Sequence, residues 1–377
     1  MKIAIYHNLP SGGAKRALFE YVRLLSKDNK FDLYTLSTSS EKTFLPLKSF
    51  LNKLIIYKVK FNKGFFPYLN FLYIYLPKIQ KKIAYDINHR NYDLVWVNHD
   101  FFTKCPILVN YIENIPVIYS CHEPPREFYE PLKFHTSNIR NIIANFFRYP
   151  IKKLDFFSVK KISRIVTDSQ FMNKQLNRIY GVKPIVINVG VDTTLFKNLK
   201  LKRHDFLLSV GALVKLKGFD FLIKALALIP KEYRLPLVII GNGGRDIKYL
   251  NNLAKINEVK LIIKRNVNDT ELVEYYNRAF LMLYAPILEP LGLVSLEAMA
   301  CCLPVLGINE GGIPETISDK EFLTKRDYKE FSNKLTYLLK NRNIVNSRRV
   351  LIRKYIKQYW KWEIGAKQLQ KIFNDMK

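Results

Sequence analysis

The sequence predicts an α/β protein of two doubly wound domains in tandem, each a parallel sheet with helices on both faces. Short apolar runs alternate with longer helical patterns, which is typical of such sheets. The alternation restarts near residue 206, after a polar, lysine-rich stretch. A chain of 377 residues with 48% hydrophobic residues is long enough to build two cored domains.

The first half of the chain contains the candidate strands of the N-terminal domain. Residues 2–6 (KIAIY) form the first, and they run into Ser11-Gly12-Gly13 and a helical pattern that continues to Leu25. The other candidate strands are 31–36, 54–59, 93–97, 116–120, 163–167 and 185–189. A strand, a turn and a helix, repeated, indicate parallel strands.

The second half repeats this pattern. FLLSVGAL (206–213) predicts a strand and a turn, and Phe219 to Leu228 a helix. Further strands are expected at 236–244, 260–264, 280–286 and 303–308, with a helix through Glu297 to Cys302 before the last of them. We expect an N-terminal domain over 1–190 and a C-terminal domain over 200–358.

Charge and cysteine content narrow the class of protein. The chain holds 61 Lys and Arg against 32 Asp and Glu, a net charge of +29, which attracts polyanions. The excess is spread along the chain without a long basic tail, which argues against a nucleic-acid arm. The four cysteines form no CxxC pair and have no histidine cluster beside them, so we expect buried, reduced thiols and no metal site.

Neither a targeting segment nor a membrane span is evident. The apolar run at the N-terminus is too short for a signal peptide, and the longest uncharged apolar stretch, Phe65 to Pro77, is too short to cross a bilayer. We expect a cytoplasmic protein, with peripheral contact on the inner face of the membrane as the only form of membrane association.

Tandem α/β domains place ligands at the carboxyl ends of their strands. The sequence has no GxGxxG after its first strand and no GxxxxGK[ST], so a dinucleotide oxidoreductase and a P-loop NTPase are disfavoured. The function must come from other motifs.

The segment with the most residues suited to a ligand site is EPLGLVSLEAMA, from Glu289 to Ala300. The helix start at Gly292 and Leu293 offers backbone N–H groups and positive dipole, which suit a diphosphate. Glu297 would lie beside that phosphate site and accept hydrogen bonds from a ribose. For the two glutamates alone, a capping loop and one exposed helix glutamate would be the simpler reading.

The whole string resembles the signature of glycosyltransferase family 4, in which seven residues separate two glutamates. The resemblance extends over nearly the whole chain. In the second half it includes 209–213, 217–220, 240–244, 304–306 and 310–315. In the first half it includes Gly12-Gly13-Ala14, Cys121-His122-Glu123-Pro124-Pro125-Arg126, Asp168-Ser169 and Gly190-Val191-Asp192.

The resemblance implies the GT-B fold, in which two Rossmann-like domains face a central cleft. It also implies a retaining glycosyltransferase that moves a hexose from a nucleotide-diphosphate sugar, GDP-mannose or a UDP-hexose, to a glycan or lipid-linked acceptor. No metal and no cofactor beyond this co-substrate are expected. The last helix, 360–377, resembles the tail that packs back on the N-terminal domain.

Residue roles follow from the family's chemistry. The departing diphosphate gains negative charge, which a site without metal must meet with cations and backbone amides. The candidate catalytic residues are Lys217 as the cation, Glu289 as the partner of sugar hydroxyls, and His122 as a hydrogen-bond partner of the donor sugar. The candidate donor-binding residues are Gly12, Gly13, Gly211, Lys215, Gly241, Gly292, Leu293, Glu297, Gly311 and Gly312.

Several of these residues also have a plain structural reading. Gly12-Gly13 could be an ordinary strand-to-helix turn, although a Cβ there or at Gly311-Gly312 would keep the backbone away from a phosphate. One position departs from the family, since Ala212 stands where an arginine is common. Either Lys215 supplies that cation, or the donor phosphate is held more weakly.

Residues 48–82 have an unusual composition, with eight lysines, nine aromatic residues and no acidic residue. This composition suits a peripheral contact with an anionic membrane, and equally a solvated lysine face over an aromatic core. It also suits single-stranded nucleic acid, but nothing else resembles an RNA-binding module, so no nucleic-acid partner is expected. The alternative to an enzyme is a non-catalytic GT-B-like protein that binds polyanions or a membrane.

Overall fold

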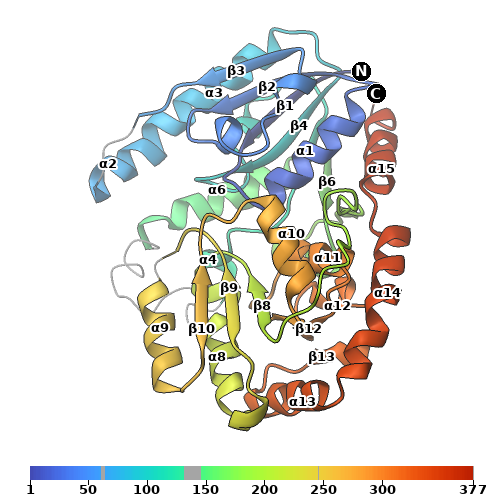
Figure 1. Cartoon of the computed structure of the whole chain (residues 1–377). Coiled ribbons are helices and arrows are strands. Elements are labelled where there is room, and N and C mark those ends of the chain that lie inside the picture. The colour runs from blue at the N-terminus through green and yellow to red at the C-terminus, as the bar shows by residue number, and fades with distance from the viewer. Residues whose placement is uncertain (61–63, 131–145, 245, 377) are drawn as a thin grey trace. The chain divides into compact units, whose positions relative to one another are not determined.

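The computed structural model describes residues 1–60, 64–130, 146–244 and 246–376. The chain divides into two compact units (Figure 1). The first unit is Met1–Val189 together with Trp362–Lys377, and the second unit is Gly190–Lys361. Each is built on its own sheet.

The first unit contains a seven-stranded sheet in the order β3-β2-β1-β4-β5-β6-β7, with every pair parallel. Central β1 pairs on both sides, so that Ile3 lies between Phe31 and Leu94. The strands are β1 (Lys2–Asn8), β2 (Lys30–Leu36), β3 (Lys53–Tyr57), β4 (Leu94–Asp100), β5 (Val117–Ser120), β6 (Arg164–Thr167) and β7 (Ile185–Val186). The strand predicted at 185–189 is shorter because only two of its residues pair with β6.

Helices of the first unit connect these parallel strands (Figure 1). They are α1 (Gly13–Leu25), α2 (Phe65–Asn70), a π-helical turn (Phe71–Tyr75), α3 (Leu76–Asn88), α4 (Arg126–Tyr129), α6 (Tyr149–Lys160), α7 (Gln170–Tyr180) and α15 (Trp362–Asn374). Local sequence sets the ends of α7: the Ser169 side chain accepts a hydrogen bond from the Met172 amide, and Gly181 adopts the left-handed conformation.

The C-terminal helix α15 packs on α1, as Figure 1 shows at the red end of the chain. The rings of Tyr21 and Trp362 meet edge to face at 5.3 Å. Gly365 allows the close approach, because a Cβ there would lie 1.9 Å from the carbonyl oxygen of Asn188. Phe373 reaches the ring of Trp96 on β4, so α15 completes the core of the first unit.

The second unit has a six-stranded parallel sheet in the order β10-β9-β8-β11-β12-β13. Its strands are β8 (Leu207–Val210), β9 (Leu237–Ile240), β10 (Leu261–Lys264), β11 (Leu281–Tyr284), β12 (Val305–Ile308) and β13 (Leu323–Thr324). Its helices are α8 (Phe219–Ala227), α9 (Ile247–Ile256), α10 (Asp269–Arg278), α11 (Leu293–Ala300), α12 (Ile313–Thr316), α13 (Tyr328–Lys340) and α14 (Arg342–Tyr359). The sequence did not predict β13, which has two residues and no apolar run.

Both sheets are doubly wound, with the strand order reversing between β1 and β4 in the first unit and between β8 and β11 in the second. At such a switch point the connections leave to opposite faces, which opens a crevice at the carboxyl ends of the two strands. The loops after β8 and β11 are therefore the first place to look for a ligand site in the second unit. Among the described residues, no helix is both long and apolar enough to cross a membrane.

Candidate active site

Lys217 and Glu289 meet at the switch point of the second unit. Lys217 ends a 3-10 turn after β8, and Glu289 lies in the loop after β11. The Lys217 Nζ atom lies 2.8 Å and 2.9 Å from the two carboxylate oxygens of Glu289. The pair is reachable from solvent, since the side chains are 26% and 13% exposed. Two residues predicted to bind different parts of a donor thus form an ion pair with each other.

Close backbone packing joins the loops that carry this pair. Gly218 follows Lys217 with φ of 66°, and a Cβ there would lie 1.9 Å from the carbonyl oxygen of Ala285. The Ile287 amide donates to the carbonyl oxygen of Leu216 at 2.8 Å. Only glycine allows this contact, which brings the Lys217 turn up against the Glu289 loop.

Gly311 and Gly312 pack closely against the backbone of the Glu289 loop. The Gly312 amide donates to the Glu289 carbonyl oxygen at 2.8 Å. A Cβ at Gly311 would lie 2.6 Å from that same oxygen, and one at Gly312 would lie 2.2 Å from the carbonyl oxygen of Pro290. We expected these glycines to make room for a phosphate, whereas the space a Cβ would take is occupied by the Glu289 loop.

Gly211 and Gly241 form a similar contact between neighbouring strand ends. A Cβ at Gly241 would lie 1.9 Å from the Gly211 carbonyl oxygen, and the Gly211 amide donates to the Ile240 carbonyl oxygen. Their glycine identity is thus explained by packing of the loops after β8 and β9.

The N-terminus of α11 follows directly after the Glu289 loop. Gly292 enters the helix with φ of 104°, and a Cβ there would lie 2.9 Å from the Tyr284 ring. The helix begins at Leu293, and the first amides of a helix have no acceptor within it. Glu297 is only 6% exposed, and its carboxylate accepts a hydrogen bond from the Tyr276 hydroxyl at 3.2 Å. The simpler reading of an exposed helix glutamate is therefore wrong.

Lys215 and Ala212 lie on the same loop as Lys217. Ala212 is exposed, and its carbonyl oxygen accepts a hydrogen bond from the Val214 amide. Lys215 lines a cavity of about 310 Å³ together with Phe219, Asp220, Asp246 and Tyr249. Burial, and next the charge of Asp220, raise the pKa of Asp246. The cavity thus combines an aromatic wall with charges of both signs.

Arg326 is a residue that sequence reasoning missed. It lies between β13 and α13, and its guanidinium donates to the carbonyl oxygens of Ala285 at 3.0 Å and Pro286 at 2.7 Å. It also pairs with Glu310 at 2.8 Å. Arg326 therefore stabilises the loop after β11 through its backbone carbonyls. The strand β13, which the sequence did not predict, positions Arg326 beside that loop.

In the first unit, His122 pairs with Asp168. His122 follows β5 and Asp168 follows the neighbouring strand β6, and their Nδ1 and Oδ2 atoms lie 2.5 Å apart. The backbone amide of His122 donates to Nε2 of His99 at 3.2 Å, and the two rings lie edge to face. Burial lowers the pKa of His99 well below its usual value.

The His122–Asp168 contact orients the imidazole ring. A carboxylate accepts but does not donate, so Nδ1 of His122 carries the proton in this hydrogen bond. The opposite nitrogen, Nε2, is buried and has no hydrogen-bond partner within the described part of the chain. When Nδ1 carries the only ring proton, Nε2 is the nitrogen that can accept a hydrogen bond. The sequence analysis included Asp168 only as part of Asp168-Ser169, one of the segments that resemble glycosyltransferase family 4, and gave it no role of its own.

The Gly12-Gly13 turn is anchored on a buried ion pair. Gly12 has φ of 144°, and a Cβ there would meet no atom within 4 Å. In the first turn of α1, fully buried Lys15 contacts Glu41 at 2.5 Å, and Glu41 also contacts Nε2 of His7 at 3.2 Å. Burial lowers the pKa of His7 to about 4. There is thus open space beside Gly12, and the helix that follows the turn carries Lys15, which belongs to the buried cluster with Glu41 and His7.

Acidic, histidine and cysteine side chains form no group of three suited to a metal ion among the described residues. The four cysteines are buried and unpaired.

Comparisons with known proteins match both halves of the chain. A family model for Glycosyltransferase Family 4 matches residues 11–195, and one for glycosyl transferases group 1 matches residues 191–358. The alpha-1,3/1,6-mannosyltransferase ALG2 of Saccharomyces cerevisiae is 23% identical, over 83% of this chain and 70% of its own length. Matches to two uncharacterized glycosyltransferases of Methanocaldococcus jannaschii cover 62% and 47% of those proteins.

Solved structures share the fold along the whole chain. Sucrose-phosphate synthase of Thermosynechococcus elongatus superimposes with a TM-score of 0.75 at 16% identity, covering 100% of this chain and 99% of its own. HepE of Anabaena, solved in complex with UDP and glucose, has a TM-score of 0.72 at 18% identity and full coverage of both chains. These similarities confirm the predicted two-domain α/β fold class, GT-B.

Proposed function

Because this chain belongs to glycosyltransferase family 4, we propose that it transfers a hexose from a nucleotide-diphosphate sugar to a glycan or lipid-linked acceptor, with retention of anomeric configuration. The observation that carries the proposal is the contact of Lys217 with Glu289, beside the N-terminus of α11 and at the switch point of the second sheet.

An ion pair between these residues suits a donor site. A nucleotide sugar brings a diphosphate, which needs a cation, and hydroxyl groups, which a carboxylate can accept. When the donor enters, Lys217 would turn to the phosphates and Glu289 to the sugar, so each charge keeps a partner in both states. The N-terminus of α11 would supply amide donors, and Glu297 an acceptor for the ribose.

In the reaction we propose, the bond between the anomeric carbon and the β-phosphate oxygen breaks as the acceptor oxygen attacks from the same face. The acceptor proton passes to the leaving phosphate, so no protein base is required. His122 would accept a hydrogen bond from the transferred sugar through Nε2. Lys217 and the helix dipole would stabilise the charge that develops on the diphosphate.

The donor is proposed to be GDP-mannose or a UDP-hexose. ALG2 is named a mannosyltransferase, and HepE was solved with UDP and glucose, so the similarities support both classes. A thermal-shift screen of GDP, UDP and their sugars would discriminate between them, since a bound ligand raises the apparent stability. Hydrolysis of the stabilising donor would then test catalysis. A donor that binds and is never turned over, with or without acceptors, would favour the non-catalytic alternative.

Metal independence is part of the proposal. Lys217 and the amides of α11 provide the positive charge that a divalent ion supplies in other phosphate sites. The position of the lysine at the switch point supports a diphosphate held without a bridging ion.

We further propose that residues 48–82 bring the protein to the inner, anionic face of a membrane from the cytoplasm. In the described part of this segment, Phe66 is 78% and Tyr75 54% exposed, whereas Phe71 is buried in the core. Phe65 contacts Phe147 at 5.2 Å, which extends the exposed aromatic surface to the start of α6. Lys58 and Lys60 of the same segment are exposed as well. Exposed rings beside lysines are what an interfacial contact needs.

A further inference from the structure

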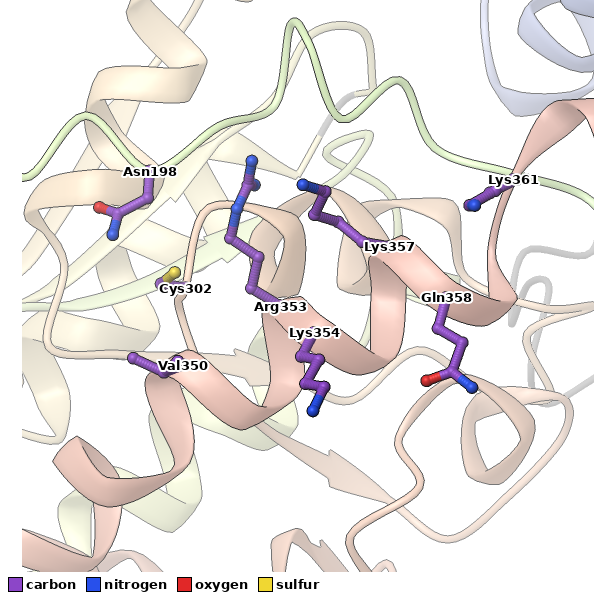
Figure 2. A pocket seen from close by; sticks show the side chains of 8 residues that line it. All are labelled: Asn198, Cys302, Val350, Arg353, Lys354, Lys357, Gln358 and Lys361. Atoms are coloured by element: carbon purple, nitrogen blue, oxygen red, sulfur yellow. The ribbon is translucent and has the colours of Figure 1, made fainter.

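A second, larger pocket lies in the second unit, at the C-terminal end of α11. Its volume is about 650 Å³, within the roughly 300–1,000 Å³ typical of small-molecule sites. Four of its lining residues carry positive charge, and none carries a carboxylate (Figure 2). The four cations are Arg353, Lys354, Lys357 and Lys361. The donor site proposed above lies at the other end of α11.

Arg353 is held rigidly in this pocket. Its guanidinium donates to the carbonyl oxygen of Phe196 at 3.1 Å, to that of Ala300, and to that of Thr193 at 3.4 Å. A cation fixed by backbone carbonyls loses little further freedom when an anion binds. Backbone carbonyls, one of them at the C-terminal end of α11, orient this guanidinium, and it has no ion pair with a carboxylate among the described residues.

Two more arginines converge on the same turn of the chain. Arg203 and Arg349 each donate to the carbonyl oxygen of Cys302, which lines the pocket. Burial, and next the charge of Arg203, lower the pKa of Arg349 to about 10. Burial raises the pKa of the Cys302 thiol, and Arg353, Arg203 and Arg349 oppose that rise. Three guanidinium groups thus gather at the C-terminal end of α11, where backbone carbonyls accept their hydrogen bonds.

The two halves of α14 differ in how their cations are paired. In the first half, Arg342 pairs with Asp205 at 2.6 Å and Arg348 with Asp319 at 2.7 Å. In the second half, Lys354 and Lys357, and Lys361 just after the helix, have no ion pair with any residue that the structure describes. The cations of α14 that pair with carboxylates therefore lie in its first half, outside the pocket.

Figure 2 shows how these charged side chains are arranged along α14 and just after it. Arg353 and Lys357 project from α14 to the same side, toward the segment that carries Asn198. Lys354 projects to the opposite side of the helix, and Lys361 lies just beyond its end. The Asn198 amide adds a neutral hydrogen-bonding group to the cationic lining.

We propose that this pocket is a second anion site, which binds a small molecule carrying phosphate groups independently of the donor site. Several lysines around a fixed guanidinium suit a ligand with more than one phosphate oxygen, because each cation can contact a different oxygen. A phosphorylated small molecule fits an open pocket of this volume, whereas a lipid headgroup would offer the same phosphate chemistry from a membrane surface.

Hydrogen exchange over residues 342–361, measured with added inorganic pyrophosphate, tests the site locally. The pocket variant carries Lys354→Gln, Lys357→Gln and Lys361→Gln. The control variant carries Lys255→Gln, Lys260→Gln and Lys329→Gln, which remove the same charge from exposed positions of the second unit outside the pocket. Because the readout covers only α14 and the residues after it, pyrophosphate bound at Lys217 does not contribute directly.

We expect pyrophosphate to slow exchange in the wild type and the control, with at least tenfold weaker apparent affinity in the pocket variant. No protection in the wild type would overturn the proposal, as would equal weakening in both variants, which would show only a response to net charge. A parallel arm uses vesicles that contain anionic phospholipid. Protection by vesicles without protection by pyrophosphate would also overturn it, because the phosphate would then be that of a lipid.

Discussion

Lys217 and Glu289, 72 positions apart in the sequence, form an ion pair in which one ammonium group contacts both carboxylate oxygens. The contact depends on Gly218, whose missing Cβ lets the turn of Lys217 rest against Ala285. The pair links the two loops that flank the switch point of the second sheet.

The first prediction concerns Glu289. Glu289→Ala should lower turnover by about 100-fold or more, because sugar hydroxyls lose their acceptor, while the protein stays folded because Lys217 is partly solvated. Turnover is measured together with thermal unfolding. Glu274→Ala, on the exposed surface of α10, is the matched control and should change neither. Near-normal turnover in a folded Glu289 variant would remove this residue from the site.

The second prediction concerns Asp168. Asp168→Asn places an amide beside Nδ1 of His122, and the amide can donate, so the ring proton should move to Nε2. We expect turnover to fall roughly tenfold or more, by analogy with partners that orient a functional histidine. The ¹⁵N chemical shifts of the His122 ring report the tautomer directly. Asp168→Glu, which keeps the carboxylate, should retain the tautomer; an unchanged tautomer in the Asn variant would contradict the proposed role.

The third prediction concerns metal. If Lys217 and the amides of α11 hold the diphosphate, turnover should be unaffected by EDTA. The assay compares the protein as purified, with EDTA, and with EDTA followed by excess Mg²⁺ or Mn²⁺. Loss of turnover on chelation and its recovery with either ion would show that the reaction needs a divalent cation.

The fourth prediction concerns the membrane. Each lysine close to an anionic surface contributes on the order of 1 kcal/mol, screened by salt. Lys53→Glu, Lys58→Glu and Lys60→Glu together should therefore abolish co-sedimentation with anionic vesicles at low salt. For the wild type, binding should weaken as salt rises, and some should survive through the exposed rings. Lys63, in the same basic run, lies outside the described residues.

The control for this experiment changes Lys255, Lys260 and Lys329 to Glu, so that net charge falls equally in the other unit. It should still sediment with the vesicles. If the control loses binding to the same extent, the attraction is that of the whole protein. If the wild type stays in the supernatant at low salt, the segment is a solvated face over an aromatic core.

The fifth prediction concerns His7 and pH. Its pKa is about 4 in the folded protein, against about 6.5 in an unfolded chain. Between these values the unfolded state binds more protons, so the free energy of unfolding should fall as pH drops from 6.5 to 4, by up to about 1.4 kcal/mol per pH unit for this group. Buried His99, whose pKa is also lowered, adds to the same slope.

Chemical denaturation across this pH range measures the effect. His7→Gln should flatten the slope, whereas His89→Gln, at an exposed position after α3, should leave it unchanged. An identical slope in the wild type and the His7 variant would show that His7 does not remain neutral in the folded protein.

Much of the fold was predictable because its strands are short, apolar and separated by turns. Of the thirteen strands in the described residues, all except β13 coincide with apolar runs that were predicted to be strands. The exception pairs through two residues and has no pattern of its own. The motif around Glu289 was equally visible, because its glycines, proline and glutamates are neighbours in the chain.

Contacts between distant residues could not be predicted in this way. Glu41 resembles any surface glutamate in the sequence, yet it is buried against Lys15 and His7 because β1 and the segment after β2 lie side by side. Asp168 and Arg326 likewise gain their roles from strands that are neighbours in the sheets. The sequence also does not show that Gly311 and Gly312 pack against the Glu289 loop, in space that a Cβ would fill.

The sequence alone predicted most of the strands, several of the helices, the doubly wound class of both domains, and the residue types available at their strand ends, because these follow from local periodicity and turn chemistry. Tertiary structure decided which of those residues touch: Lys217 with Glu289, His122 with Asp168, and three arginines with the end of α11. The physical reason is that a parallel sheet brings together the ends of strands separated by whole helices, and burial then selects the pairs whose charges and hydrogen bonds are satisfied.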